Sequence, residues 1–159
     1  MTRSVFGNGL ACAPIRLRRS RVLTLFADGV TLQNTVWLSD RIWRADYGVP
    51  EVRLSLRALL IHELMHVWQH QNLRAYHWTK AAAEHVPDLL RFRYGSSVYA
   101  YTLPPESDPR GKLLDYRYEQ QGRLLQDYFM LRELGRDVRA DEAVIGDTLR
   151  NPPPRANRR

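Results

Sequence analysis

Residues 60–69 read Leu60-Ile61-His62-Glu63-Leu64-Met65-His66-Val67-Trp68-Gln69, an H-E-x-x-H pattern inside an apolar run. On an α-helix, residues four apart lie one turn above each other, so His62 and His66 project from the same face. Two imidazoles in this arrangement can bind one metal ion, and in zinc peptidases with this pattern the intervening Glu takes a proton from the metal-bound water. The pattern therefore predicts a helix with a catalytic zinc site, and Glu63 as its base.

The residues around the pattern weigh against a chance match. Apolar side chains surround the polar trio on the predicted helix, namely Ile61, Leu64, Met65 and Val67. Most of this helix is therefore expected to face the protein interior, where an unpaired Glu or His is costly. A bound metal gives these polar groups a reason to be there. The alternatives are a buried polar network or a surface coincidence, because so short a pattern also occurs by chance.

A catalytic zinc site has three protein ligands and an open water position, so a third ligand is needed. The extended metzincin pattern requires a glycine and a histidine at the positions of Gln69 and Asn72, which excludes that class. His70 continues the four-residue spacing but lies two turns from His62. A single zinc ion with bonds of ~2.0–2.1 Å does not reach that far along one helix.

A second predicted helix offers an acidic ligand. Residues 118–134 carry apolar side chains at helical spacing, which are Leu124, Leu125, Tyr128, Leu131 and Leu134. Glu119 lies near the start of this helix and could face the two histidines. Asp127, two turns later, is the alternative third ligand, or an acceptor for the other N–H of a ligand histidine. Without a metal, Glu119 would be a first-turn carboxylate that interacts favourably with the helix dipole.

Two segments together resemble a known family. They are His62-Glu63-Leu64-Met65-His66-Val67-Trp68-Gln69-His70-Gln71, and Tyr118-Glu119-Gln120-Gln121 with the following Asp127-Tyr128-Phe129. They resemble the zincin-like core domain linked to bacterial extracellular contractile injection systems and, more narrowly, Vgr-related proteins found near type VI secretion components. The resemblance covers about residues 20–135. It implies a gluzincin-type site, with His62 and His66 as ligands, Glu119 as the third ligand and Glu63 as the base.

The expected fold class is α+β, a small zincin-like domain in which the active-site helix packs beside a small sheet and a second helix carries the third ligand. We expect an irregular basic segment at residues 1–20, a single domain at 21–150 and a flexible Pro- and Arg-rich tail at 151–159. Strands are predicted at 21–26, 30–32, 35–38 and 94–103. Helices are predicted at 39–43, from 51–55 to 72, at 77–92 with a break near Pro87, at 118–134 and at 141–149. Residues 104–111 favour a loop.

Charge and cysteine content narrow the function classes. The formal charge of +7 is carried mostly by scattered arginines, which is more typical of a solvated surface than of a nucleic-acid site, so no nucleic-acid partner is expected. Cys12 is the only cysteine, which excludes an intramolecular disulfide and a Cys-based zinc site. No stretch approaches the ~20 apolar residues of a membrane span, and residues 1–19 lack a signal-peptide pattern. We expect a protein that is cytoplasmic as made, unless a specialised secretion system exports it.

These features together predict a zinc-dependent metallopeptidase or related amide hydrolase, in which Glu63 activates a zinc-bound water against a peptide or protein substrate. The group that stabilises the oxyanion stays open among His77, His85, Tyr116 and Tyr118. The alternative is a catalytically weak or inactive zincin-fold module that binds or assembles with a secretion or contractile injection system. On both interpretations a secretion-system component is an expected partner, and the chain is a candidate effector or toxin.

Overall fold

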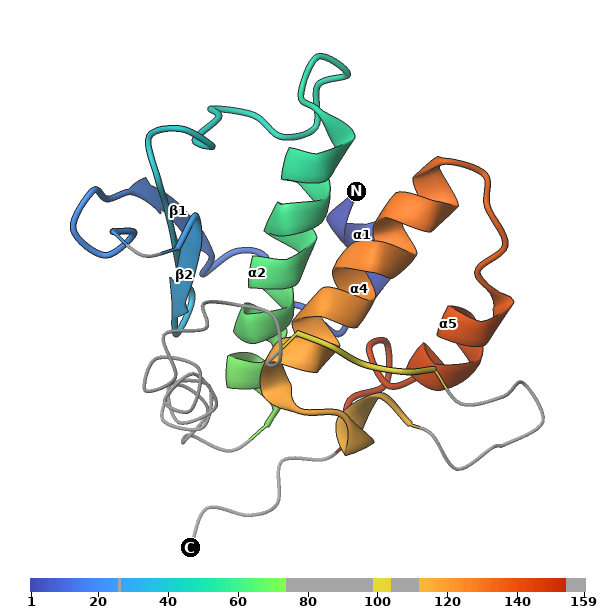
Figure 1. The fold of residues 1–159 in the computed structure, drawn as a ribbon. Helices are drawn as coiled ribbons and strands as arrows, with labels where there is room; N and C mark the ends of the chain where they lie inside the picture. Colours follow the sequence, from blue (N-terminus) through green and yellow to red (C-terminus); the bar gives the residue numbers. More distant parts are fainter. Residues whose placement is uncertain (26, 74–98, 104–111, 154–159) are drawn as a thin grey trace, which may run out of the picture.

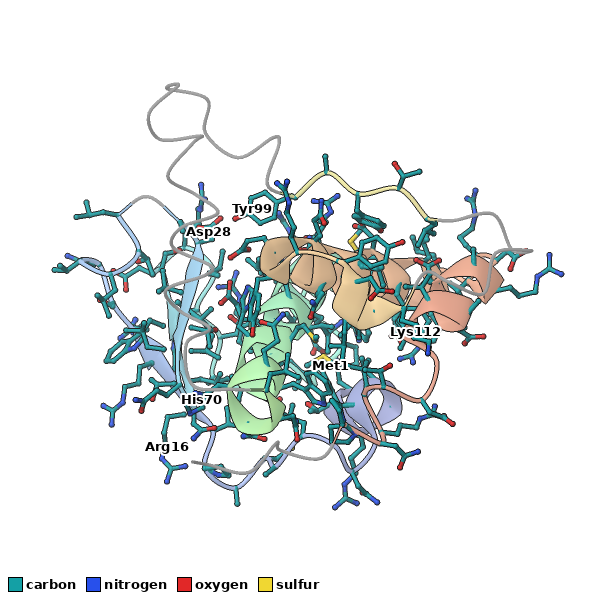
Figure 2. The ribbon with its side chains drawn as sticks, turned by 90° about the horizontal axis from the view of Figure 1, so that it is seen from below. Met1, Arg16, Asp28, His70, Tyr99 and Lys112 are labelled. Atoms are coloured by element: carbon teal, nitrogen blue, oxygen red, sulfur yellow. The ribbon has the colours of Figure 1, made fainter. Side chains whose placement is uncertain are left out.

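The computed structural model describes residues 1–25, 27–73, 99–103 and 112–153. Its central element is helix α2, Leu54–Asn72. A small sheet lies on one side of α2, and helix α4, Tyr118–Glu133, lies on the other (Figure 1). Figure 2, turned by 90°, shows the same order of sheet, α2 and α4. The fold is therefore α+β, as the sequence predicts, and α2 is covered on both sides.

Helix α2 is buried along most of its length because apolar residues occur all around it. Its buried side chains are Ala58, Leu60, Ile61, His62, Glu63, Leu64, Met65, Val67, Trp68 and Gln69. A helix without a continuous polar face is typical of a protein interior. The helix follows Arg53, whose ψ of 138° is not helical, and it stops before Leu73, which is extended. The predicted boundaries of this helix are confirmed.

The sheet contains three short strands, β1 Arg16–Arg19, β2 Gly29–Leu32 and β3 Thr35–Leu38, in the order β1-β3-β2. Strands β2 and β3 form an antiparallel hairpin in which Gly29 pairs with Leu38, whereas β1 runs parallel to β3. Val36 and Leu38 are buried while their neighbours in β3 are half-buried, so one face of the sheet packs on the core. Strand β2 lies at an edge of the sheet, against α2.

Helix α4 follows the short 3-10 helix η1, Leu113–Asp115, and turns one face toward α2. The buried residues on α4 are Glu119, Gln121, Gly122, Leu124, Leu125, Tyr128 and Phe129. Fully burying a leucine or phenylalanine stabilises a fold by about 1.5–3 kcal/mol, so the packing of α4 on α2 is a main source of stability. Gly135, with φ of 65°, adopts the left-handed conformation that commonly ends helices.

Two short helices complete the core, α1 Thr2–Phe6 and α5 Arg139–Ile145. Phe6 is fully buried, and the buried apolar residues of both helices belong to the same cluster as those of α2 and α4. The indole Nε1 of Trp68 donates a hydrogen bond of 3.1 Å to the carbonyl of Leu149. This bond ties α2 to the chain that follows α5. None of the described helices is both long and apolar enough to cross a membrane.

The first 20 residues are not the irregular segment that the sequence predicts. Helix α1 and strand β1 both lie within them, and Val5, Phe6 and Leu10 are buried. The glycines and the proline of this segment signal an irregular backbone, but burial of these apolar side chains outweighs that weak local signal. Short elements of this kind are stabilised by tertiary packing more than by their own propensity.

The predicted strand at residues 21–26 is wrong, because the described residues of this segment form turns and bends. The strand lies earlier, in the arginine-rich β1. There the guanidinium groups of Arg18 and Arg19 each lie 6.0 Å from the ring centre of a tryptophan, Trp37 and Trp43 respectively. Contacts of this kind between a guanidinium group and an aromatic ring are favourable. The predicted helix at residues 39–43 is also wrong, since this segment is a turn.

Some of the predicted elements after α2 are confirmed, and others lie outside the described residues. Helix α4 confirms the second helix, and α5 confirms a last short helix, although α5 begins two residues earlier and ends at Ile145. Residues 99–103 contain no strand. The predicted helix at 77–92, the first part of the predicted strand at 94–103, the loop at 104–111 and most of the tail lie outside the described residues. The division into one domain and a tail stays a prediction.

Candidate metal centre

Three polar side chains meet where α2 crosses α4. His62 and His66 come from successive turns of α2, and Glu119 comes from the first turn of α4. The Nε2 atoms of the two histidines lie 3.2 Å apart, and Glu119 Oε2 lies 3.3 Å from His62 Nε2 and 3.5 Å from His66 Nε2. The three atoms thus form a nearly equilateral triangle. Among the described residues, the structure brings together the three side chains that the sequence singles out as ligands.

The size and chemistry of this triangle fit a zinc ion. Bonds of ~2.0–2.2 Å at tetrahedral angles place neighbouring ligand atoms roughly 3.3–3.6 Å apart. The measured separations of 3.2, 3.3 and 3.5 Å lie at or close to this range. Two imidazoles and one carboxylate are also a donor set that suits zinc. The residues present can therefore hold this metal with little rearrangement.

The electrostatic field at the triangle favours a cation. Burial by itself lowers the pKa of His66, but the charge and hydrogen bond of Glu119, helped by Glu63 and Gln69, raise this pKa from 6.5 to about 9. The side chains of His62 and Glu119 are each only 7% exposed, and that of His66 is 14% exposed. Carboxylates that are so little solvated need a positive partner. A proton on the histidine, or a metal ion in its place, supplies such a partner.

His62 contacts Glu119 and His66 through Nε2, and packing holds the other side of its ring. Its Nδ1 atom is buried and has no hydrogen-bond partner among the described residues. Gly122 of α4 faces the ring, and a Cβ atom there would lie 2.8 Å from Cε1 and 2.9 Å from both ring nitrogens. The ring of Tyr99 covers it from another side, with 5.8 Å between ring centres. In Figure 2, Tyr99 lies beside the end of α4. Glycine is thus required where α4 approaches this ligand.

Glu63 is held by the sheet. The hydroxyl of Thr31 in β2 donates to Glu63 Oε2 at 2.7 Å and lies 3.2 Å from the backbone carbonyl of Glu63. Gly29, at the start of the same strand, leaves room for this carboxylate, because a Cβ atom there would lie 2.5 Å from Oε1. Glu63 is only 5% exposed. Strand β2 therefore orients the side chain to which the sequence assigns the role of base.

Asp127, the alternative third ligand, lies elsewhere. Its Oδ2 accepts hydrogen bonds from Arg123 Nε at 2.9 Å and from the hydroxyl of Tyr101 at 3.1 Å. It is not part of the cluster that contains Glu119. Burial, followed by the charge and hydrogen bond of Asp127, raises the pKa of Tyr101. The structure therefore favours Glu119 over Asp127 at the position of the third ligand.

Two of the four candidate oxyanion stabilisers, Tyr116 and Tyr118, lie within the described residues. Tyr116 donates its hydroxyl hydrogen to the carbonyl of Thr102 at 3.0 Å. Tyr118 contributes its backbone carbonyl to a bond from Gln69. His77 and His85 lie outside the described residues.

The sequence analysis did not identify three residues that shape the site, namely Gly29, Thr31 and Gly122. Only Gly122 could have been recognised from the sequence, because a glycine inside a helical pattern often allows close packing against a neighbouring element. The others act through contacts between distant segments, which spacing along the chain does not indicate.

Comparison with known proteins gives this site a context. No protein-family model matches the chain. Over 157 residues it is 30% identical to the type VI secretion system spike protein VgrG2b of Pseudomonas aeruginosa, an alignment that covers 96% of this chain and 14% of that protein. The solved effector domain of Pseudomonas aeruginosa VgrG2b has a TM-score of 0.68 and 28% identity, with 88% of this chain and 74% of that chain covered. The chain is homologous to this effector domain.

The homology to VgrG2b confirms the Vgr-related part of the resemblance that the sequence shows. The chain spans only 14% of the length of this curated relative, and it matches the separately solved effector domain over most of both chains. The similarity therefore concerns an effector domain and not the whole spike protein.

Proposed function

We propose that this chain is a zinc-dependent metallopeptidase or related amide hydrolase. The observation that carries the proposal is the triangle of His62, His66 and Glu119, whose ligand atoms have the separations of a tetrahedral zinc shell. Glu63 adds a buried carboxylate directly after the first of these histidines in the sequence. Three protein ligands with a neighbouring carboxylate are the usual equipment of a hydrolytic zinc site.

The roles of the residues follow from their positions. His62, His66 and Glu119 would hold the ion, which supplies Lewis-acid polarisation of the substrate carbonyl and lowers the pKa of water to about 7. Glu63 accepts the proton from the attacking water and returns it to the leaving nitrogen, as general base and then general acid. Thr31 keeps the Glu63 carboxylate in one orientation through the 2.7 Å hydrogen bond. Positioning of this kind matters because proton transfer requires contact within hydrogen-bond distance.

We further propose that the chain acts as an effector domain of a type VI secretion system. The homology to the effector domain of VgrG2b supports this association. A chain that is cytoplasmic as made would then reach its target by export through that machine. Its substrate would be a peptide or protein, and peptides of the peptidoglycan type belong to the same chemical class. A component of the secretion system is the second expected partner.

One observation favours the alternative, a module that keeps the fold and binds a secretion component without useful turnover. The side chains of the site are strongly buried, with 7% exposure for His62 and Glu119 and 5% for Glu63. A substrate carbonyl must reach the ligand triangle for hydrolysis. On this alternative, Glu63→Gln leaves partner binding unchanged and the wild type has no turnover to lose.

Metal analysis tests the proposal first. We expect about one zinc ion for each wild-type chain, and loss or strong weakening of zinc binding in His62→Ala and in Glu119→Ala. His70→Ala is the matched control, because His70 lies on the same helix but outside the ligand cluster. If the wild type holds no metal after zinc is added and the excess removed, the zinc site is wrong.

A second measurement separates the enzyme from the binding module. Hydrolysis of a peptide library by the zinc-loaded wild type should disappear in Glu63→Gln, while zinc content stays the same. Turnover that survives this substitution would contradict the role of Glu63 as base.

A further inference from the structure

We propose that Gln69 and Gln121 form an amide relay that sets the tautomer of His66, so that its Nε2 lone pair faces the ligand triangle. The relay runs from α4 to α2 and ends on the Nδ1 atom of His66. Its hydrogen-bond directions follow from the structure alone, whereas its consequence for zinc rests on the proposed function.

The direction of the relay is fixed at its far end by a backbone carbonyl. Gln121 places its Nε2 atom 2.7 Å from the carbonyl oxygen of Tyr116. A carbonyl only accepts, so the amide nitrogen of Gln121 must be on this side. The amide oxygen of Gln121 therefore points the other way, toward Gln69.

A second carbonyl fixes the next amide. The Nε2 atom of Gln69 lies 2.9 Å from Gln121 Oε1 and 3.3 Å from the carbonyl oxygen of Tyr118. Turning the Gln69 amide over would place its oxygen against these two acceptors, which is repulsive. The Gln69 oxygen must therefore face His66, and it lies 2.8 Å from Nδ1. Since this oxygen only accepts, Nδ1 of His66 carries the proton and Nε2 is left to bind the metal.

Burial makes the relay sensitive to the loss of any member. Gln69 is fully buried and Gln121 is 3% exposed. Water is therefore poorly placed to replace a missing partner, and a buried amide without its bonds is strongly disfavoured. The two amides are consequently expected to hold one arrangement instead of exchanging between several.

The relay also connects the two helices that supply the ligands. Gln69 lies three residues after His66 on α2, and Gln121 lies two residues after Glu119 on α4. A bond between the two amides therefore holds these ligands in register. His62 has no such support, because its Nδ1 atom has no partner among the described residues. Gln69 and Gln121 are thus positioning residues for His66 and Glu119.

The test compares three glutamine-to-methionine variants, which keep length and remove the amide. Gln69→Met removes the acceptor at His66, and Gln121→Met removes only the second member of the relay. Gln71→Met is the matched control, because Gln71 lies on the same helix but bonds Ala11 and Asn34, away from the site. Zinc affinity should fall about 10–100-fold in Gln69→Met, the usual effect of losing an outer partner of a ligand histidine, less in Gln121→Met, and not in Gln71→Met.

A second readout needs no metal. Nitrogen-resolved NMR of the metal-free wild-type chain, recorded above the pH at which the His66 imidazolium becomes neutral, should show the remaining proton on Nδ1 of His66, and Gln69→Met should lose this preference for Nδ1. The proposal is overturned if the neutral ring carries its proton on Nε2, or if zinc affinity in Gln69→Met stays within about twofold of the wild type. A wild-type chain that shows the Nδ1 proton but binds no zinc would support the relay and overturn the proposed zinc enzyme. The metal-free measurement on the wild type decides the relay even if Gln69→Met does not fold.

Discussion

Gly122 of α4 lies so close to His62 of α2 that a methyl group on its Cα would be 2.8 Å from the imidazole Cε1. Gly122→Ala must therefore displace the ring relative to α4, which carries Glu119. We expect zinc affinity to fall about 100-fold, because a displacement near 1 Å is enough to spoil a bound geometry. Alanine is otherwise the better helix former by about 1 kcal/mol, so the stability of the metal-free chain should fall less than its zinc affinity. Competition with a chelator measures the affinity, and urea unfolding measures the stability.

Gly135→Ala is the control for this substitution. Gly135 follows the same helix and has φ of 65°, and a methyl group on its Cα would meet no described atom within 4 Å. Alanine in that conformation costs about 1–2 kcal/mol of folding free energy. Gly135→Ala should therefore lower stability and leave zinc affinity unchanged. An equal loss of zinc affinity in the two variants would mean that general destabilisation, not the position of His62, explains the first result.

Thr31→Val tests how strand β2 orients the base. Valine keeps the shape of threonine but removes the 2.7 Å hydrogen bond to Glu63 Oε2. A hydrogen bond to a charged group contributes about 1.5–3 kcal/mol, so kcat should fall roughly 10- to 100-fold if the bond matters in the transition state. Zinc content should not change, because Thr31 does not touch the ligands. Thr31→Ser should restore most of the turnover, and equal rates in Thr31→Val and the wild type would remove Thr31 from the mechanism.

The two helices of the site could be predicted from the sequence because their apolar and histidine spacings extend over continuous segments. The spacing of His62 and His66 places both on one helix face, and the apolar stripe of residues 118–134 indicates a second helix with Glu119 at its start. Helix α2 is long enough that an error of one or two residues at its ends leaves the histidines in the same relation. Two continuous segments of sequence were thus enough to predict the three residues of the ligand triangle.

The sheet and the supports of the site were less predictable. Strand β1 consists of Arg16–Arg19 with one apolar residue, so it has no hydrophobic alternation that would indicate a strand paired with β3. Thr31 and Gly29 act on Glu63 across more than 30 positions of sequence. Contacts of this kind are created by the tertiary fold, and no local propensity encodes them.

Glu119→Ala and Asp127→Ala form a matched pair that decides the third ligand. Both substitutions remove a carboxylate from α4, but only Glu119 lies within 3.5 Å of the histidine nitrogens. Asp127 instead accepts bonds from Arg123 and Tyr101. Zinc affinity should fall at least about 100-fold in Glu119→Ala, because losing a ligand lowers affinity more than the 10–100-fold caused by losing a residue that only hydrogen-bonds a ligand. Zinc affinity should be unchanged in Asp127→Ala. If zinc affinity falls in Asp127→Ala and not in Glu119→Ala, the third ligand is Asp127.

The raised pKa of His66 leads us to expect that the stability of the metal-free chain depends on pH. This pKa is about 9 in the folded state, against 6.5 for a histidine without these neighbours, so the folded state binds the proton more tightly than the unfolded state. The resulting stabilisation is complete below pH 6.5 and is lost as the pH rises through 9. A shift of this size corresponds to roughly 3 kcal/mol of folding free energy. Urea unfolding in the presence of a chelator should therefore show a falling free energy of unfolding across this window.

The same measurement on His66→Gln isolates this contribution, because other groups that titrate in the window remain in both chains. The difference between wild type and variant should shrink from pH 6.5 to pH 9. Zinc should have the opposite dependence, since His66 must lose its proton to bind the ion, and apparent zinc affinity should rise up to about tenfold per pH unit until pH 9. A wild type whose metal-free stability runs parallel to that of His66→Gln would show that Glu119 does not hold a proton on His66.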